Sequence, residues 1–174
     1  MANTYKLIAS STVGSGGAAN IEFTSIPATY TDLCLKLSAR ASNAGNWEWI
    51  GVQFNNDTAS NYSARYLYGI GSGSTASGSD SSTAIRVIYI DSNNATASTF
   101  SNTELYIPNY ASSNYKSVST DTVMENNSST AIVSLNAGLW SSASAITSIK
   151  MTVQSATADF MQHSTAHLYG ISNS

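Results

Sequence analysis

Apolar and polar residues alternate with a period of two along most of this chain. The clearest example is residues 31–41, TDLCLKLSARA, which place Leu33, Leu35, Leu37 and Ala39 on one face and mostly polar residues on the other. Period-two alternation is typical of a β-strand with one buried face, whereas the 3.6-residue period of a helix is nearly absent. The pattern predicts an all-β protein.

Similar segments recur every 10 to 18 residues and are separated by clusters of Asn, Gly and Ser, which favour turns. The spacing predicts about ten strands, and nothing marks an internal boundary. We therefore expect residues 1–174 to form a single domain, an antiparallel β-sandwich of the jelly-roll type. The predicted strands lie within residues 5–13, 20–26, 31–41, 46–56, 62–70, 84–91, 98–110, 115–125, 130–140, 145–155 and 163–171.

The glycine- and serine-rich run from Gly69 to Thr83 needs a separate interpretation. A phosphate-binding loop requires a lysine and a following helix, but this run contains no Lys or Arg and leads into AIRVIYI, which is rich in β-branched residues. We therefore predict that it is a loop between two strands.

Aromatic residues are the best indication of a binding surface. Trp47 and Trp49 alternate with Ile50, Val52 and Phe54 in residues 46–56, so the tryptophans face outward if the other three face the core. Tyr62, Tyr66 and Tyr68 alternate in the next segment. Exposed aromatic rings on a sheet can stack on sugars or anchor a protein interface. Trp47, Trp49, Tyr66 and Tyr68 are therefore the candidate interaction surface; the alternative is that the tryptophans belong to the core.

Charged residues make up only 10% of the chain, and Ser, Thr and Asn together exceed a third. The formal net charge is −3, and the seven Lys and Arg form no basic stripe, which argues against nucleic acid as a partner. No apolar run approaches the roughly 20 residues of a membrane span. The N-terminus lacks the pattern of a cleaved leader. We expect a soluble protein, made in the cytoplasm, with a hydrogen-bonding surface that suits neutral glycans or neighbouring copies.

The sequence offers little support for a metal site or a cofactor. His163 and His167 would lie about 13 Å apart on one strand, too far for one ion. Cys34, the single cysteine, is expected to be a small buried residue and excludes an internal disulfide. The Asn- and Asp-rich stretches, including DSNNATAS, could supply oxygens to calcium but are better explained as turns.

Catalysis is also poorly supported, and we expect no enzymatic activity. No Ser elbow lies between a strand and a helix, so a Ser-His-Asp arrangement has no local signature. A pair of carboxylates for glycoside hydrolysis could be drawn from Asp32, Glu48, Glu104, Asp121 and Glu125. Each is better explained as a strand-edge or turn residue.

The opening stretch TYKLIASSTVGSGGAANIEFTSIPATYTDLCLKLSARAS, together with NYSARYLYGIGSGS and the terminal HLYGI, resembles short virion proteins of tailed phages of marine bacteria and cyanobacteria. The resemblance spans about Thr4 to Asn61 and the last strand, roughly two-thirds of the chain. Its motifs are strands and turns without a chemical signature, so they transfer no functional residues. AGNWEWIGVQFNN is more aromatic than is usual in that group.

The resemblance implies a structural component of the virion that contacts the major capsid protein or other virion proteins and associates with itself, a homotrimer being one arrangement. A chain that starts and ends on a strand, with no shaft or anchor, fits a compact module better than a tail fibre. We therefore expect a capsid decoration or cement protein. The alternative is a tail-associated or receptor-binding module that recognises host glycans through Trp47, Trp49 and Tyr66.

Overall fold

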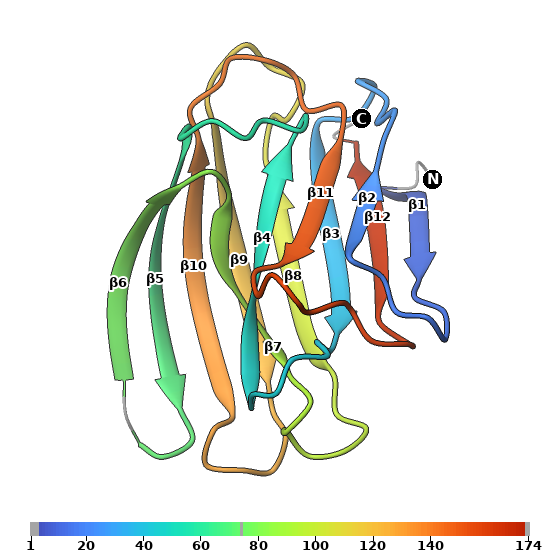
Figure 1. The fold of residues 1–174 in the computed structure, drawn as a ribbon. Coiled ribbons are helices and arrows are strands. Elements are labelled where there is room, and N and C mark those ends of the chain that lie inside the picture. Colours follow the sequence, from blue (N-terminus) through green and yellow to red (C-terminus); the bar gives the residue numbers. More distant parts are fainter. Residues whose placement is uncertain (1–3, 74, 173–174) are drawn as a thin grey trace.

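The computed structural model describes residues 4–73 and 75–172, and this part of the chain contains twelve strands and no helix (Figure 1). All pairings between these strands are antiparallel, which confirms the predicted all-β class; the strand number is slightly above the expected ten. The strands are β1 (Tyr5–Thr12), β2 (Asn20–Phe23), β3 (Asp32–Ala39), β4 (Trp47–Phe54), β5 (Tyr62–Ile70), β6 (Thr75–Ser82), β7 (Ile85–Asp91), β8 (Ser101–Ile107), β9 (Lys116–Met124), β10 (Ile132–Trp140), β11 (Ile149–Val153) and β12 (Thr165–Ile171).

The strands form two stacked sheets. The large sheet has eight strands in the order β1-β12-β3-β8-β9-β10-β5-β6, and the small sheet has four in the order β2-β11-β4-β7. The pairs β1·β12, β2·β11, β3·β8 and β4·β7 join early strands to late ones, as in an antiparallel ribbon wound around the core. This wrapped ribbon is the jelly-roll arrangement of two Greek keys, so the predicted sandwich type is confirmed.

The core lies between the two sheets and is made by the alternation that the sequence displays. Leu33, Leu35 and Leu37 of β3 are buried in the same apolar cluster as Ile50 and Phe54 of β4. Since successive side chains point to opposite faces, the remaining positions of these strands face outward. Burial of such aliphatic and aromatic side chains is the main favourable contribution to folding.

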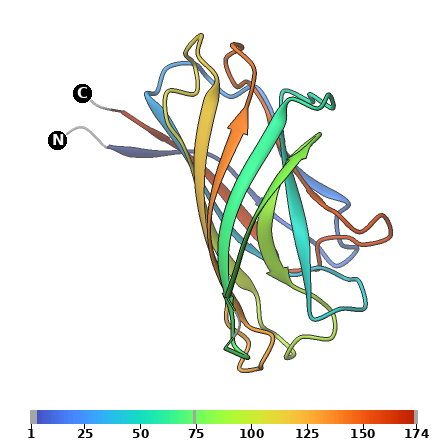
Figure 2. The same ribbon diagram turned by 90° about the vertical axis from the view of Figure 1, so that its left-hand side faces the viewer.

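Two hairpins extend the large sheet beyond the jelly roll. β5–β6 is inserted between β4 and β7, and β9–β10 between β8 and β11; all four strands join the large sheet after β8. The small sheet ends at β7, which contacts β9, β10 and β5. Figure 2 turns this side, with β5 and β6, toward the viewer. The half of the large sheet made by these hairpins is wider than the layer that covers it.

The interpretation of Gly69–Thr83 as a loop was wrong, because Thr75–Ser82 forms β6. β6 pairs with β5 over the register Tyr62↔Ser82 to Gly69↔Thr75 and is the outer strand of the sheet. An edge strand is held by backbone hydrogen bonds on one side and needs no apolar face, so its composition carries no alternating signal.

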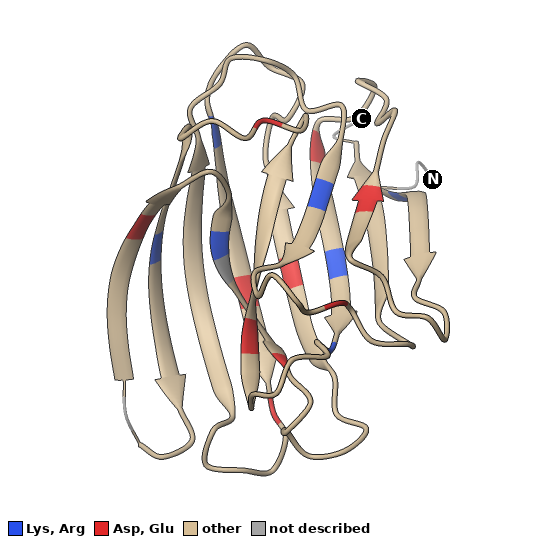
Figure 3. Ribbon diagram, viewed as in Figure 1, with Lys and Arg blue, Asp and Glu red and all other residues tan. Residues whose placement is uncertain are grey.

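Charged side chains are few and lie on both sheets (Figure 3). The salt bridge found among the described residues joins Lys36 of β3 to Glu104 of β8 on the outside of the large sheet. No helix in residues 4–73 and 75–172 is long and apolar enough to cross a membrane.

Candidate functional site

Five aromatic rings meet where the edge of the small sheet lies over the wide half of the large one. Trp47 and Trp49 come from β4, Tyr66 and Tyr68 from β5, and Tyr89 from β7; we call these five residues the aromatic cluster. The ring centroids of Trp47 and Trp49 are 5.8 Å apart, and those of Trp47 and Tyr89 are 5.5 Å apart. Tyr68 lies 5.5 Å from Tyr89 and 5.9 Å from Tyr66, so the contacts form one continuous chain of rings.

The tryptophans reach this position because of the alternation in β4. Ile50, Val52 and Phe54 are fully buried in the core, so Trp47 and Trp49 lie on the other face of the small sheet, as predicted. Neither tryptophan belongs to the main core, but Trp49 is partly buried and packs on a second buried cluster, Tyr89, Met124 and Ile132, so the alternative holds in part for Trp49.

Tyr89 links the two halves of the aromatic cluster and is the residue that the sequence interpretation missed. It is opposite Trp49 in the β4–β7 register and is only 4% exposed. It packs on Met124 and Ile132, two buried residues of the large sheet. Burial raises the pKa of its hydroxyl to about 12. Its alternation with Ile88 and Ile90 is visible in the sequence, but its partners are set by the pairing of β4 with β7.

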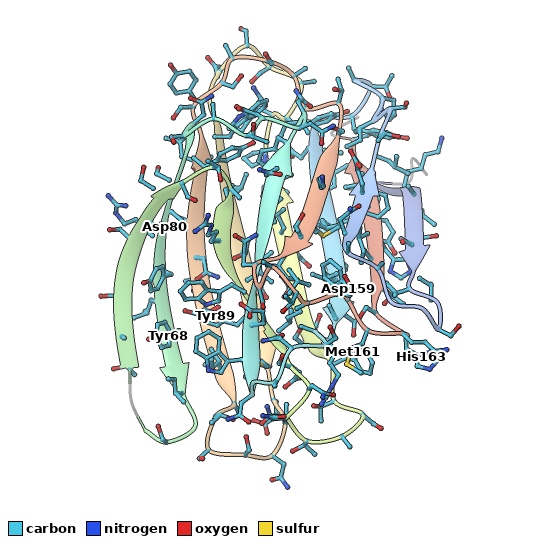
Figure 4. The ribbon with its side chains drawn as sticks, viewed as in Figure 1. Tyr68, Asp80, Tyr89, Asp159, Met161 and His163 are labelled. Atoms are coloured by element: carbon cyan, nitrogen blue, oxygen red, sulfur yellow. The ribbon has the colours of Figure 1, made fainter. Side chains whose placement is uncertain are left out.

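A β-bulge keeps Ile85, Ile88 and Ile90 of β7 on the core side, although Ile85 and Ile88 are an odd number of residues apart. The β4–β7 register shifts between Ile50 and Gly51, so β7 has an additional residue there. Bulges increase the local twist of a strand. Beyond the bulge, Ile88 and Ile90 still face the main core while Tyr89 packs on the large sheet. Figure 4 shows Tyr89 and Tyr68 side by side, between the small sheet and the β5–β6 hairpin.

The tyrosines of β5 lie on the inner face of the large sheet, not on its outside. Tyr62 on the same face is buried in the main core, whereas Tyr66 and Tyr68 are partly buried beyond the edge of the small sheet. The ring of Tyr66 rests on Gly78 of β6, where an added Cβ would come within 2.4 Å of the hydroxyl. The glycine therefore makes room for the ring.

The structure thus brings together all four residues of the predicted surface, but they are unequally accessible. Trp47 is 38% exposed, and Trp49, Tyr66 and Tyr68 are partly buried. Trp47 is the part of the aromatic cluster that a ligand can reach most easily. A packed group of rings with one open indole can stack on an apolar surface or on the face of a sugar ring.

The outside of the same half-sheet carries a second surface that the sequence interpretation did not identify. Four aliphatic side chains project there into solvent: Leu67 of β5 (57% exposed), Val123 of β9 (44%), and Val133 and Leu135 of β10 (58% and 63%). Leu67 and Leu135 are directly opposite in the register, as are Val133 and Val123. We call these four residues the outer apolar face.

The outer apolar face is not flat. Shallow depressions of about 430 Å³ and 450 Å³ flank the Leu67–Leu135 pair; Val133 and Gly69 line the first, and Arg65 and Ala137 the second. Adjacent exposed aliphatic residues of this kind are uncommon on monomeric proteins and mark interaction surfaces.

The two histidines do not share a strand face as the sequence suggested. β12 begins at Thr165, so only His167 lies on it, and His163 precedes it with a backbone φ of 75°. Within residues 4–73 and 75–172, no three His, Cys, Asp or Glu side chains are grouped as metal ligands would be. Cys34 is buried as predicted, between Tyr106 and Tyr169 in the register, and burial raises its thiol pKa to about 11.

Most of the candidate carboxylates have structural partners. Asp32 accepts hydrogen bonds from the Tyr106 hydroxyl (2.6 Å) and the Asn109 backbone (2.8 Å). Glu48 accepts one from the Asn43 amide (3.0 Å), and Glu125 accepts one from the Asn127 backbone (2.7 Å).

One pair of carboxylates is adjacent. Glu104 and Asp121 are opposite each other on β8 and β9, on the outside of the large sheet. Glu104 is already bound by the Lys36 ammonium. The geometry therefore places this pair on an open sheet surface beside a cation.

The DSNNATAS stretch, weighed above as a source of calcium ligands, surrounds an arginine instead. The Arg40 guanidinium donates hydrogen bonds to the backbone carbonyls of Asn93 (3.3 Å), Ala95 (2.9 Å), Thr96 (2.8 Å) and Thr99 (2.9 Å). A cation of the protein itself thus occupies the centre of this loop.

A comparison of the chain with protein-family models finds no match, and a comparison with curated proteins finds none either.

Proposed function

We propose that this protein is a structural component of a tailed-phage virion, made in the host cytoplasm, and that it acts as a capsid decoration protein that stabilises the assembled shell. One observation carries the proposal: the wide half of the large sheet presents the aromatic cluster on its inner side and the outer apolar face on its outer side. Two nearly uncharged surfaces on opposite sides of one rigid sheet allow a protein to hold two neighbours at once. The resemblance of its opening strands to phage virion proteins supports the same role.

The proposed mechanism is selective binding to the assembled state. A protein that binds neighbouring subunits of the major capsid protein, but not free subunits, shifts the equilibrium toward the shell by mass action. Each contact with a capsid subunit is weak. Once a copy is bound through one contact, its other binding surface is held at a high local concentration beside the neighbouring subunit, so the contacts together bind more tightly than either alone. The role needs no catalytic group and no cofactor.

Copy number per particle is the decisive measurement. Quantitative mass spectrometry of purified virions gives the ratio of this protein to the major capsid protein. A decoration protein is expected at a ratio near one or near one-third, and purified protein should bind expanded shells that lack it. A ratio of a few per hundred would refute the decoration role and place the protein at the tail or at a vertex.

A second candidate role is recognition of host-surface glycans by a tail-associated or receptor-binding module. The accessible indole of Trp47, supported by Trp49 and Tyr89, favours it because aromatic faces stack on sugar rings. Replacing Trp47 and Trp49 with alanine should abolish binding to host polysaccharide in a glycan-array or co-sedimentation assay. Tyr115→Ala is the matched control, since Tyr115 is 61% exposed and lies outside the aromatic cluster.

The two roles are separated by the same pair of variants. Under the decoration role, the wild-type protein does not bind polysaccharide. Replacing the two tryptophans then weakens binding to capsid shells only if the aromatic cluster contacts the capsid. Under the glycan role, the tryptophan variant loses cell or polysaccharide binding while the Tyr115 variant retains it. Binding to neither shells nor glycans would contradict both roles.

A further inference from the structure

We propose that the outer apolar face binds a second copy of this chain, forming a two-fold dimer in which two large sheets stack on each other. This pairing needs only the chain itself, so it can be tested independently of a place in a virion. Three properties of the face point to a second copy: its position on one sheet, its charges and its size.

The register of the large sheet makes the face complementary to itself. Leu67 and Leu135 are directly opposite on β5 and β10. A two-fold axis parallel to the strands and between β5 and β10 would therefore bring Leu67 of one copy over Leu135 of the other, twice. Because stacked sheets cross at about 30°, the axis would deviate by about 15° from the exact strand direction, and each leucine pair would lie obliquely over its counterpart and enter the flanking depressions.

The charges on this side of the sheet favour the same arrangement. The outward positions of β5, β6, β9 and β10 all lie in the described part of the chain, and the charged residues among them are Arg65 and Asp121. In one copy they are two strands apart with β10 between them. The face has no net charge, so two copies would not repel each other.

The two-fold axis would convert these charges into an intermolecular pair. The axis places β9 of the second copy over β6 of the first, which is the strand next to β5. Asp121 is level with Leu67 in the register, so Asp121 of the second copy is displaced from Arg65 by one strand across the sheet and by two residues along it. Neighbouring strands are about 4.8 Å apart, two residues rise about 7 Å, and stacked sheets are about 10 Å apart. The Cα atoms of Arg65 and of Asp121 in the second copy would therefore be about 13 Å apart, a distance that extended Arg and Asp side chains span. Each dimer would contain this pair twice.

The area is sufficient for a weak dimer. Four strands of about eight residues cover roughly 27 by 19 Å, or about 500 Å² on each copy. The total of about 1,000 Å² is at the lower end of specific interfaces, which predicts an affinity in the micromolar range. The face is also the side away from the small sheet, so pairing leaves the aromatic cluster accessible to another partner.

Sedimentation equilibrium of the purified full chain, over a concentration series reaching about 200 µM, tests the pairing against the micromolar affinity expected. The wild type should follow a monomer–dimer equilibrium. Leu135→Asp should weaken it at least tenfold, because it puts a carboxylate against apolar side chains. Leu7→Asp is the matched control: Leu7 is 50% exposed on the opposite edge strand β1 and should leave the equilibrium unchanged.

A charge exchange identifies the second copy as the partner. Arg65→Glu alone should weaken the dimer about threefold to tenfold, because the introduced carboxylate would face the acidic Asp121 of the other copy. Adding Asp121→Arg restores opposite charges and should return the affinity to within about twofold of the wild type. Circular dichroism and urea midpoints should be unchanged in these exposed-site variants, so loss of pairing can be distinguished from unfolding.

Several results would overturn the proposal. A wild type that stays monomeric at the highest concentration has no such interface. A trimer, one arrangement that fits the phage resemblance, would exclude the two-fold axis. Dimers that survive Leu135→Asp, or that dissociate equally with Leu7→Asp, use another surface, such as the free edge of β6. Failure of the charge exchange to restore affinity would contradict the proposed orientation.

Discussion

Replacing Arg40 with methionine should destabilise the protein strongly, although the residue lies outside both candidate surfaces. Arg40 is buried, and its guanidinium donates five hydrogen bonds to the 93–99 segment, four of them to backbone carbonyls. Methionine fills a similar volume but donates no hydrogen bond. The carbonyls must then find water or remain unpaired.

The magnitude follows from these contacts. Hydrogen bonds to a charged group contribute about 1.5–3 kcal/mol each, but the loop lies near the surface and water can replace some of them. Removal of one partner of a buried charge network costs about 3–5 kcal/mol. We therefore expect Arg40→Met to lower the free energy of unfolding by about 4 kcal/mol, or about 8–16 °C in melting temperature for a chain of this length.

The effect should also depend on pH. Burial raises the pKa of the Asp91 carboxyl, and the charge of Arg40 opposes that rise. The Asn126 amide, which also lowers this pKa through its hydrogen bond to Asp91, remains in the variant, but without Arg40 the pKa rises further and an ionised Asp91 at pH 7 lacks the nearby positive charge. A raised folded-state pKa stabilises the fold at low pH, and that contribution is lost as the pH rises through the folded value. The difference between variant and wild type should therefore shrink as the pH falls from 7 toward 4.

Urea denaturation followed by tryptophan fluorescence at several pH values measures both effects. Lys36→Met is the control, because Lys36 forms a salt bridge with Glu104 at an exposed site and such pairs contribute about 0–1 kcal/mol. If Arg40→Met cost no more than Lys36→Met at pH 7, the idea that the guanidinium holds the 93–99 segment would be refuted. An effect independent of pH would remove the coupling to Asp91.

Local geometry leads to three further predictions. Gly138→Ala should destabilise by about 1–3 kcal/mol in urea denaturation, because the new Cβ would lie 2.8 Å from Ile85 Cδ1 in the core. Asp57→Asn should flatten the acid side of the stability–pH curve: hydrogen bonds from Asn61 and Trp140 lower the pKa of Asp57, so its contribution is present at neutral pH and is lost as the pH falls through the folded value. The Cys34 thiol, buried and with its pKa raised to about 11, should react with a thiol reagent only after the protein unfolds.

Each of these predictions has its own control. Gly14→Ala should leave stability nearly unchanged, because nothing lies within 4 Å of an added Cβ there; equal losses at both glycines would contradict the packing argument. An acid limb unaltered by Asp57→Asn would show that another group governs it. Rapid labelling of Cys34 under native conditions would mean that the large sheet opens locally at β3.

The aromatic cluster shows how far the sequence leads toward the candidate site. Alternation in β4 correctly separated Trp47 and Trp49 from the core face. The same reasoning placed Tyr66 and Tyr68 on an outward surface, but they line the inner side of the large sheet. Alternation tells which residues share a face of a strand, but it does not tell which face the second layer covers.

The sequence by itself determined the all-β class, the jelly-roll sandwich, and the core of β3 and β4. These depend on a period of two and on turn residues, which are local properties. The β6 strand, the meeting of Tyr89 with Trp49, and the outer apolar face depend on which strands are neighbours. Leu67 and Leu135 alternate in the sequence like core residues, yet they project into solvent. They lie on the outer side of the large sheet, whereas the small sheet packs only against its inner side. Only the tertiary structure, by deciding where the second layer lies, distinguishes a buried apolar face from an exposed one.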